Sequence, residues 1–174
     1  MIEIQRIDAA HAKDLQLPNE PVDLFGRLIV TYVNQEWSCA EERFPEVMQM
    51  CFPDEHYDYA AMTQNSIFLG AYEGDMCVGL AVLQQAMFRY LYLYDLKVNR
   101  AYRKAGVGRK LLEAARDVAQ TNGYRGIYTI GQDNNLGACR FYLKTGFQIG
   151  GLDTRVYGGT SQEGKSDILF YLDI

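Results

Sequence analysis

The stretch from Tyr90 to Gly108 constrains the fold of this chain more than any other. Residues 90–98 are mainly aromatic and aliphatic, which is typical of a packed β-strand. A polar turn follows, then Gly106 and Gly108, then apolar residues at helical spacing. Strand, glycine turn and helix N-terminus together favour anion binding, because main-chain N–H groups point out of the turn and the helix dipole attracts negative charge. The stretch therefore predicts a site for a phosphorylated cofactor.

Two helices are predicted in the second half of the chain. The apolar stripe of the first recurs at spacings of three, four and seven and consists of Val107, Leu111, Leu112, Ala115, Val118 and Ala119. Gly123 suits the left-handed position that ends this helix, and Gly146 does the same for a second helix that runs to Lys144. Three polar residues are N-cap candidates for the second helix: Asp133, Asn134 and Asn135.

The remaining pattern consists mainly of strands. Residues 2–6 alternate, and residues 66–72 and 76–85 flank a Glu-Gly-Asp turn that predicts an antiparallel hairpin. Residues 88–98 continue this hairpin as a third strand, and Gly79 marks a bulge or a close approach of another element. Further strands are predicted at 126–132, 147–149 and 168–173.

The segment between residues 22 and 64 is harder to interpret. Residues 22–33 fit an extended or hairpin segment, although a helix after Pro21 fits their periodicity almost as well. Residues 41–58 are acidic and interrupted by proline, and they lie near Tyr57, Tyr59 and Trp37. Carboxylates beside aromatic faces can hold a cationic ligand. A solvated loop with a short helix over residues 55–64 is the plainer interpretation.

Composition limits the class of protein. The chain has 174 residues, of which 48% are hydrophobic, enough for one domain with a sizeable core. No apolar run approaches the about 20 residues of a membrane-spanning helix, and the first residues lack a signal-peptide pattern. We therefore expect a cytoplasmic protein that binds no membrane. The four cysteines have no paired spacing and no histidine at ligand spacing, which predicts reduced thiols and no metal site.

Charge is distributed unevenly along the chain. Residues 1–99 carry 15 acidic and 6 basic side chains, a balance of −9, whereas residues 100–174 carry 7 acidic and 11 basic ones, a balance of +4. Such asymmetry would suit an anionic cofactor on one side and a cationic substrate on the other. A solvated acidic surface explains the same counts.

Two motifs about 30 residues apart carry a family resemblance. They are Arg103-x-x-Gly106-x-Gly108 and Asn135-x-x-Ala138-x-x-Phe141-Tyr142-x-x-x-Gly146-Phe147. With a helix and a strand between them, they resemble the GNAT-type N-acetyltransferase superfamily. Within it the chain is similar to the streptothricin acetyltransferase family, for example at Pro18-Asn19-Glu20-Pro21, Trp37 and Gln132-Asp133-Asn134-Asn135-Leu136. It departs from that family between Ser38 and Gln64, where the acidic run is thinner.

The resemblance implies an α/β (α+β) fold of the GNAT type. Its mixed central sheet would have about six to seven strands, splayed at the centre, with helices on both faces. Residues 1–174 would form a single domain, with residues 1–99 mainly on the acceptor side and residues 100–174 mainly on the acetyl-CoA side. The cofactor would be acetyl-CoA, with coenzyme A as the co-product.

Candidate cofactor ligands follow from the glycine turn and from the resemblance. Main-chain donors of Gly106, Val107 and Gly108 would bind the pyrophosphate, with charge from Arg103, Arg109 and Lys104. The resemblance implies that the pantetheine arm pairs with the strand residues Leu96, Lys97 and Val98, with an N–H near Leu96 for the developing oxyanion. Asn135 would bond the pantetheine or cap the second helix.

Tyr142 is the candidate acid. A thiolate must be protonated as it leaves, and a phenol with a pKa of about 10 is a neutral donor at pH 7. Tyr142 occupies the tyrosine position of the family motif. A tyrosine on a helix is more often a packing residue, so its position in the motif, and not its residue type, carries this assignment.

Asp95 is the candidate base or substrate anchor. An ammonium of pKa about 10.4 must lose a proton before it can attack, and Asp95 lies late in the central strand. A structural ion pair with Lys97 is an equally good interpretation. Acidic surroundings also attract a cation and stabilise its protonated form.

These residues predict direct acetyl transfer to a cationic small-molecule amine in a ternary complex. The resemblance implies streptothricin, whose β-lysine moiety carries primary amines, and a role in antibiotic resistance. A polyamine, another amine or a protein N-terminus is the alternative acceptor, and a non-catalytic acetyl-CoA-binding regulatory module is the alternative class. No nucleic-acid partner is expected. The acceptor, the path of the amine proton and the oligomeric state, with a homodimer as one option, are left open.

Overall fold

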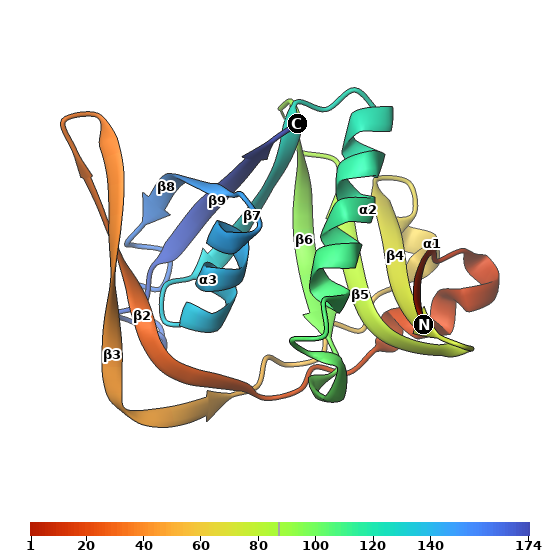
Figure 1. The fold of residues 1–174 in the computed structure, drawn as a ribbon, viewed down its shortest axis with the longest axis horizontal. Coiled ribbons are helices and arrows are strands. Elements are labelled where there is room, and N and C mark those ends of the chain that lie inside the picture. The colour runs from red at the N-terminus through yellow and green to blue at the C-terminus, as the bar shows by residue number, and fades with distance from the viewer. Residues whose placement is uncertain (87) are drawn as a thin grey trace. The chain divides into compact units, whose positions relative to one another are not determined.

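A computed structural model describes residues 1–86 and 88–174 (Figure 1). Internal contacts divide the chain into two compact units, which are described one at a time. The first consists of residues 1–20, 51–127 and 174, and the second of residues 21–50 and 128–173. Within the described residues, no helix is both long and apolar enough to cross a membrane.

The first unit is built on four antiparallel strands in the order β1-β4-β5-β6. Their bounds are β1 Ile2–Arg6, β4 Ser66–Glu73, β5 Met76–Gln84 and β6 Tyr90–Val98. Among the described residues, four helical segments accompany them: 3₁₀ helices at Ala9–Gln16 and Arg100–Tyr102, the short α1 at Tyr59–Met62 and the long α2 at Val107–Thr121. The predicted meander of residues 66–98 is confirmed.

Helix α2 packs on one face of this sheet through the predicted stripe, of which Val118 is only half-buried. Gly79 makes the close packing possible, because a Cβ there would lie 3.2 Å from Leu111 Cδ1 and 3.3 Å from Val107 Cγ1. A bulge also falls here, since Ala71 pairs with Gly79 but Tyr72 with Cys77. Both readings of Gly79 from the sequence, a bulge and a close approach, are therefore confirmed.

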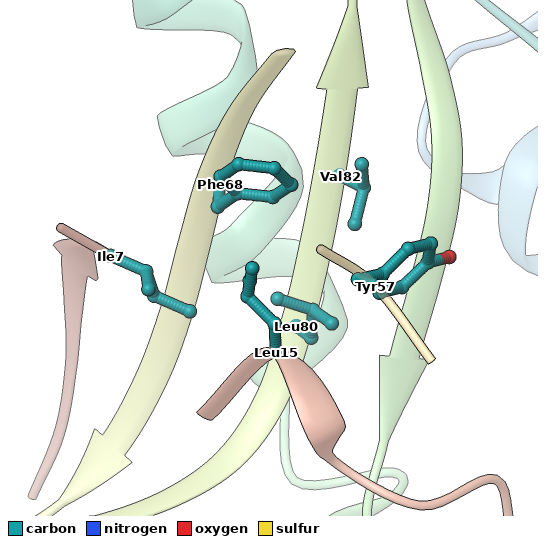
Figure 2. Packing of buried hydrophobic residues seen from close by; sticks show 6 residues of the cluster. All are labelled: Ile7, Leu15, Tyr57, Phe68, Leu80 and Val82. Atoms are coloured by element: carbon teal, nitrogen blue, oxygen red, sulfur yellow. The ribbon is translucent and has the colours of Figure 1, made fainter. Parts of the chain in front are cut away.

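The other face of the strands buries a hydrophobic cluster. Strand residues alternate between faces, so Phe68, Leu80 and Val82 point away from α2. The cluster consists of Ile7, Leu15, Tyr57, Phe68, Leu80 and Val82 (Figure 2). Tyr57 lies in it with its hydroxyl directed away from the other five side chains.

The second unit contains two sheets. Strands β2 (Val22–Val33) and β3 (Glu36–Met50) form an antiparallel ribbon. The other strands are neighbours in the order β7 (Gly126–Gln132), β9 (Asp167–Asp173) and β8 (Gln148–Asp153). The first two residues of β7 belong to the first unit. Helix α3 (Leu136–Lys144) contacts β2. Asn34 and Gln35 link β2 to β3 with φ of 53° and 66°, the positive values that a tight two-residue hairpin turn requires.

The ribbon β2–β3 settles how residues 22–50 fold. The extended or hairpin interpretation of residues 22–33 is confirmed, but the solvated loop expected after residue 41 is wrong as far as Met50, because β3 continues through Pro45. Leu24 pairs with Met48 and Gly26 with Arg43, so Pro45 lies in a bulge. A bulge tolerates proline because the missing N–H is not needed there. The expected helix at 55–64 is reduced to α1.

Two carboxylates of β3 are paired with arginines of the same unit. Glu41 accepts from Arg140 of α3 at 2.7 and 2.5 Å, and Glu42 lies 3.4 Å from Arg27. The charged side chains in this part of the acidic segment therefore lie at the surface, although the backbone is a strand and not the expected loop. Apart from the ribbon β2–β3, the described residues form four strands in the first unit and three in the second. This agrees with the predicted α/β class and with the predicted six to seven strands of the sheet. The predicted splay concerns how the units meet and stays a prediction.

Candidate active site

The predicted glycine turn lies between β6 and α2. After β6 ends at Val98 the chain makes one 3₁₀ turn, and α2 begins at Val107. Lys104 and Gly106 have φ of 66° and 85°, so two left-handed residues turn the chain onto the helix. Gly106 is the N-cap and no side chain caps it. The first N–H groups of a helix have no partner within it, so those of Val107, Gly108 and Arg109 can donate to an anion.

Arg103 stabilises this turn through hydrogen bonds to two main-chain carbonyls. Its Nε donates to the Val98 carbonyl at 2.9 Å, and Nη2 donates to the Glu20 carbonyl at 3.3 Å. The Glu20 carboxylate in turn accepts from the main-chain N–H of Arg100 at 2.5 Å. The guanidinium therefore adds charge beside the turn while it joins the end of β6 to residue 20. Lys104 and Arg109 are exposed beside it.

A β-bulge sets the position of Asp95. Leu83 of β5 pairs with Leu93, whereas Val82 pairs with Asp95, so Tyr94 is the extra residue in β6. A bulge bends its strand and redirects the following side chains, and bulges are common next to active sites. Past it, regular pairing resumes for the candidate strand residues Leu96, Lys97 and Val98. Their predicted backbone contacts with the pantetheine arm stay a prediction.

Asp95 belongs to a partly buried cluster of charged groups. Tyr57 Oη donates to Asp95 Oδ2 at 3.0 Å, and Lys97 Nζ lies 3.5 Å from the same oxygen. Lys97 Nζ also binds Glu55 Oε2 at 2.6 Å and lies 5.5 Å from the centre of the Tyr57 ring. Side-chain exposure is 10% for Lys97, 17% for Asp95 and 26% for Glu55. The pair of Asp95 with Lys97, one of the two predicted readings of Asp95, is present.

The sequence patterns identified neither Tyr57 nor Glu55 as a partner of Asp95. The available signal was the acidic and aromatic composition of residues 41–58, which suggested a cation held by carboxylates and a ring. The structure contains such an arrangement, and the cation in it is Lys97 of the chain itself. Two carboxylates share this one ammonium, so the cluster keeps a net negative charge when both are ionised.

The cluster shifts the pKa values of its members. Burial raises the pKa of the Asp95 carboxyl above its usual value, and the neighbouring Glu55 charge adds to this effect against the opposing Lys97 ammonium and Tyr57 hydrogen bond. Burial also raises the pKa of Tyr57, as do the charges of Asp95 and Glu55, so its hydroxyl stays a donor. Burial alone would raise the pKa of Glu55. The hydrogen bonds from Lys97 and Asn19 outweigh this effect, so the pKa of Glu55 is lowered.

Asn19 fixes the loop that carries Glu55. Its side-chain Nδ2 donates to the Pro53 carbonyl and to Glu55 Oε1, both at 2.9 Å. Its main-chain N–H donates to Asp54 Oδ1 at 2.7 Å. These bonds tie residues 53–55 to Asn19, so Glu55 contacts Lys97 from a restrained loop.

Tyr142 lies in the second unit, on α3. It is buried, and its ring centroid is 5.4 Å from that of Phe147 and 5.3 Å from that of Phe170. Gly131 of β7 allows Phe170 to pack closely beside Tyr142, because a Cβ there would be 3.1 Å from Phe170 Cε2. The ring is thus fixed by packing. Asp95 belongs to the other unit. That Tyr142 and Asp95 both lie beside the thioester of the cofactor therefore stays a prediction.

Asn135 caps α3, one of its two predicted roles. Its Oδ1 accepts from the Ala138 N–H at 3.2 Å. The side-chain N–H₂ group takes no part in this cap, so the predicted bond to pantetheine is compatible with it. Cys139 on the same helix is fully buried, and burial raises its pKa to about 12, which leaves an inert thiol. Among the residues that the structure describes, no group of His, Cys, Asp or Glu could hold a metal ion.

Comparison with known proteins gives the family. The profile of the acetyltransferase (GNAT) family matches residues 32–147. Streptothricin acetyltransferase A of Bacillus subtilis (strain 168) is 33% identical over 170 residues, which is 97% of this chain and 98% of that protein. This chain belongs to the acetyltransferase (GNAT) family. The predicted superfamily and activity are confirmed: the protein is an acetyl-CoA-dependent N-acetyltransferase.

Solved structures agree with this membership of the GNAT family. A candidate streptothricin acetyltransferase of Bacillus anthracis strain Ames, in complex with acetyl coenzyme A, has a TM-score of 0.89 and 27% identity over 100% of both chains. Nourseothricin acetyltransferase has a TM-score of 0.81 over 99% of this chain and 98% of that chain, at 22% identity, which supports the GNAT fold alone. The uncapped, left-handed Gly106 at the start of α2 fits the phosphates of such a cofactor.

Proposed function

We propose that this GNAT enzyme acetylates a primary amine of streptothricin and thereby confers resistance to that antibiotic. The observation that carries the proposal is the 33% identity to streptothricin acetyltransferase A, which extends over 97% of this chain. The partly buried cluster of Asp95, Glu55 and Lys97 supports a cationic acceptor, because two carboxylates share one ammonium.

The turn before α2 would hold the cofactor. The N–H groups of Val107, Gly108 and Arg109 donate to phosphate oxygens, and Arg103, Lys104 and Arg109 supply positive charge. Acetyl-CoA, when bound, supplies the acetyl group as a thioester. Leu96 and Val98 orient the cofactor through their main-chain groups, and the Asn135 side-chain amide adds a donor.

Asp95 prepares the acceptor for attack. A primary ammonium has a pKa of about 10.4, so about one molecule in 10³ is uncharged at pH 7. A carboxylate removes the proton more readily when its own pKa lies closer to the working pH. Burial raises the pKa of Asp95 in this direction. Asp95 therefore anchors the ammonium and then accepts its proton.

Tyr142 protonates the leaving sulfur. A phenol is neutral at pH 7 and is a donor that water can restore. Packing against Phe147 and Phe170 fixes its ring, which suits a proton transfer that needs one orientation. The buried, inert Cys139 gives no support to an acyl-enzyme, so the transfer is direct.

Release of free thiol from acetyl-CoA tests this proposal, with streptothricin, spermidine and an N-terminal peptide as acceptors. We expect release with streptothricin and one acetyl group on the product by mass spectrometry. Release with spermidine or the peptide alone would assign another acceptor to the same enzyme. Absence of release with every amine, together with binding of acetyl-CoA, would instead favour a regulatory module.

A further inference from the structure

The contacts of Asp95 fall on one of its two oxygens. Tyr57 Oη donates to Oδ2 at 3.0 Å, and Lys97 Nζ lies 3.5 Å from Oδ2. Oδ1 takes part in neither contact. A carboxylate oxygen has room for two hydrogen bonds, so these two groups use the capacity of Oδ2. Oδ1 keeps its capacity for a further donor.

Tyr57 is held more firmly than a surface tyrosine would be. Its side chain is 8% exposed and packs among Ile7, Leu15, Phe68, Leu80 and Val82. Figure 2 shows the ring lodged in this cluster and the hydroxyl pointing out of it. Because the core fixes the ring, the hydroxyl is presented to Asp95 at little further entropic cost.

Lys97 is restrained in a similar way. Glu55 Oε2 binds its Nζ at 2.6 Å, and Asn19 holds the other oxygen of Glu55 at 2.9 Å. The ammonium also lies over the Tyr57 ring. The donors on Oδ2 are therefore both fixed by groups outside β6, one by the hydrophobic core and the other by the loop 53–55.

We propose that Tyr57 is a positioning residue for the acceptor amine. With Lys97 it fixes Oδ2 of Asp95, so that Oδ1 receives an N–H of the primary ammonium. This inference rests on the proposed function, since it takes Asp95 as the residue that meets the acceptor. Tyr57 itself touches neither the substrate nor the thioester, and it acts through Asp95.

The titratable and charged groups that face Asp95 are Tyr57 and Glu55 from the loop before α1 and Lys97 from β6. The Tyr57 hydrogen bond lowers the pKa of Asp95 against the larger effect of burial. Loss of the hydroxyl therefore raises this pKa further. Because the base must be ionised, the acidic limb of kcat/KM for the amine then moves to higher pH.

The test compares Tyr57→Phe with Tyr72→Phe. Tyr72 is a matched control in the same unit, since it is buried and its hydroxyl donates to another carboxylate, Asp14 Oδ2, at 2.8 Å. We expect Tyr57→Phe to lower kcat/KM for the amine about tenfold at neutral pH and to move the acidic limb upward by about one pH unit. Tyr72→Phe should leave both unchanged, and both variants should bind acetyl-CoA like the wild type.

Adding Tyr57→Phe to Asp95→Asn should cost nothing further, because the hydroxyl then has no base to position. If Tyr57→Phe keeps the wild-type pH profile and the kcat/KM of Tyr72→Phe, the positioning role is overturned. The proposed function fails separately, when the wild type releases no thiol with streptothricin. Thermal unfolding of each variant shows whether a loss of rate comes from loss of the fold.

Discussion

Gly106 offers a sharp test of the cofactor site, because helix α2 has a left-handed glycine at each end. Gly106 at the N-cap has φ of 85° and Gly123 beyond the C-cap has φ of 72°, and a Cβ at either position would meet no atom within 4 Å. Alanine at either position therefore fits sterically. Its cost is conformational, about 1–2 kcal/mol for a left-handed residue with a side chain.

The two alanine variants should consequently be matched in stability. Alanine also reduces the entropy of the unfolded chain, and this effect offsets about 0.4–1 kcal/mol of the cost. The free energy of unfolding therefore falls by about 1 kcal/mol. For a chain of this size that lowers Tm by about 2–4 °C. Differential scanning calorimetry should give similar values for Gly106→Ala and Gly123→Ala.

The affinity for acetyl-CoA should differ between the two alanine variants. A phosphate that accepts from Val107, Gly108 and Arg109 must approach the backbone of the cap, where a methyl group would stand. We expect Kd for acetyl-CoA, measured by calorimetry, to rise at least about tenfold in Gly106→Ala and to stay at the wild-type value in Gly123→Ala. Gly106→Val should abolish binding while the fold persists. Wild-type affinity in Gly106→Ala, or an equal loss in both alanine variants, would refute the phosphate site.

Three further predictions concern the chemistry. Tyr142→Phe should lower kcat about 10²-fold or more with little change in Kd for acetyl-CoA, and wild-type turnover would exclude its role as the acid. Asp95→Asn should lower kcat/KM for the amine and remove the acidic limb of its pH profile. In the wild type this limb should lie above the usual aspartate pKa, since burial raises the pKa of Asp95. An unchanged limb in Asp95→Asn would assign the base to another group. Cys139→Ala should keep wild-type turnover, and its inactivation would reopen a covalent acyl-enzyme.

Local patterns predicted the parts of the fold that local forces decide. The stripe of α2, the left-handed glycines after the helices and the hairpin of residues 66–84 each depend on residues within a few positions of one another. The course of β3 could not be predicted in this way. Pro45 argues against a strand, and only the pairing of β2 with β3 shows that it lies in a bulge. The rule that proline is excluded from strands does not hold at a position where the partner strand needs no N–H group from it.

The candidate site shows the same division. Asp95 and the glycine turn could be proposed from the sequence because they sit late in a recognisable strand and at the start of a recognisable helix. Tyr57 and Glu55 were not assigned to Asp95, since their contacts join residues about 40 positions apart. The amphipathic and charge patterns of residues 51–58 resemble those of any solvated loop. What distinguishes this loop is the burial of Tyr57 and the contacts of Tyr57 and Glu55 with β6, which the sequence does not show.

Asn19 and Glu20 connect the proposed phosphate turn to the proposed acceptor cluster within the first unit. Glu20 accepts hydrogen bonds from the Arg100 N–H and the Arg103 guanidinium beside the turn before α2, while its neighbour Asn19 holds Glu55 beside Lys97. Prolines on both sides restrict the backbone of these two residues, so their positions are coupled. A shift of the turn that moved Glu20 would therefore also strain the loop that carries Glu55. The proposed phosphate turn and the carboxylate cluster thus share one short support, residues 19–20, which holds both in place.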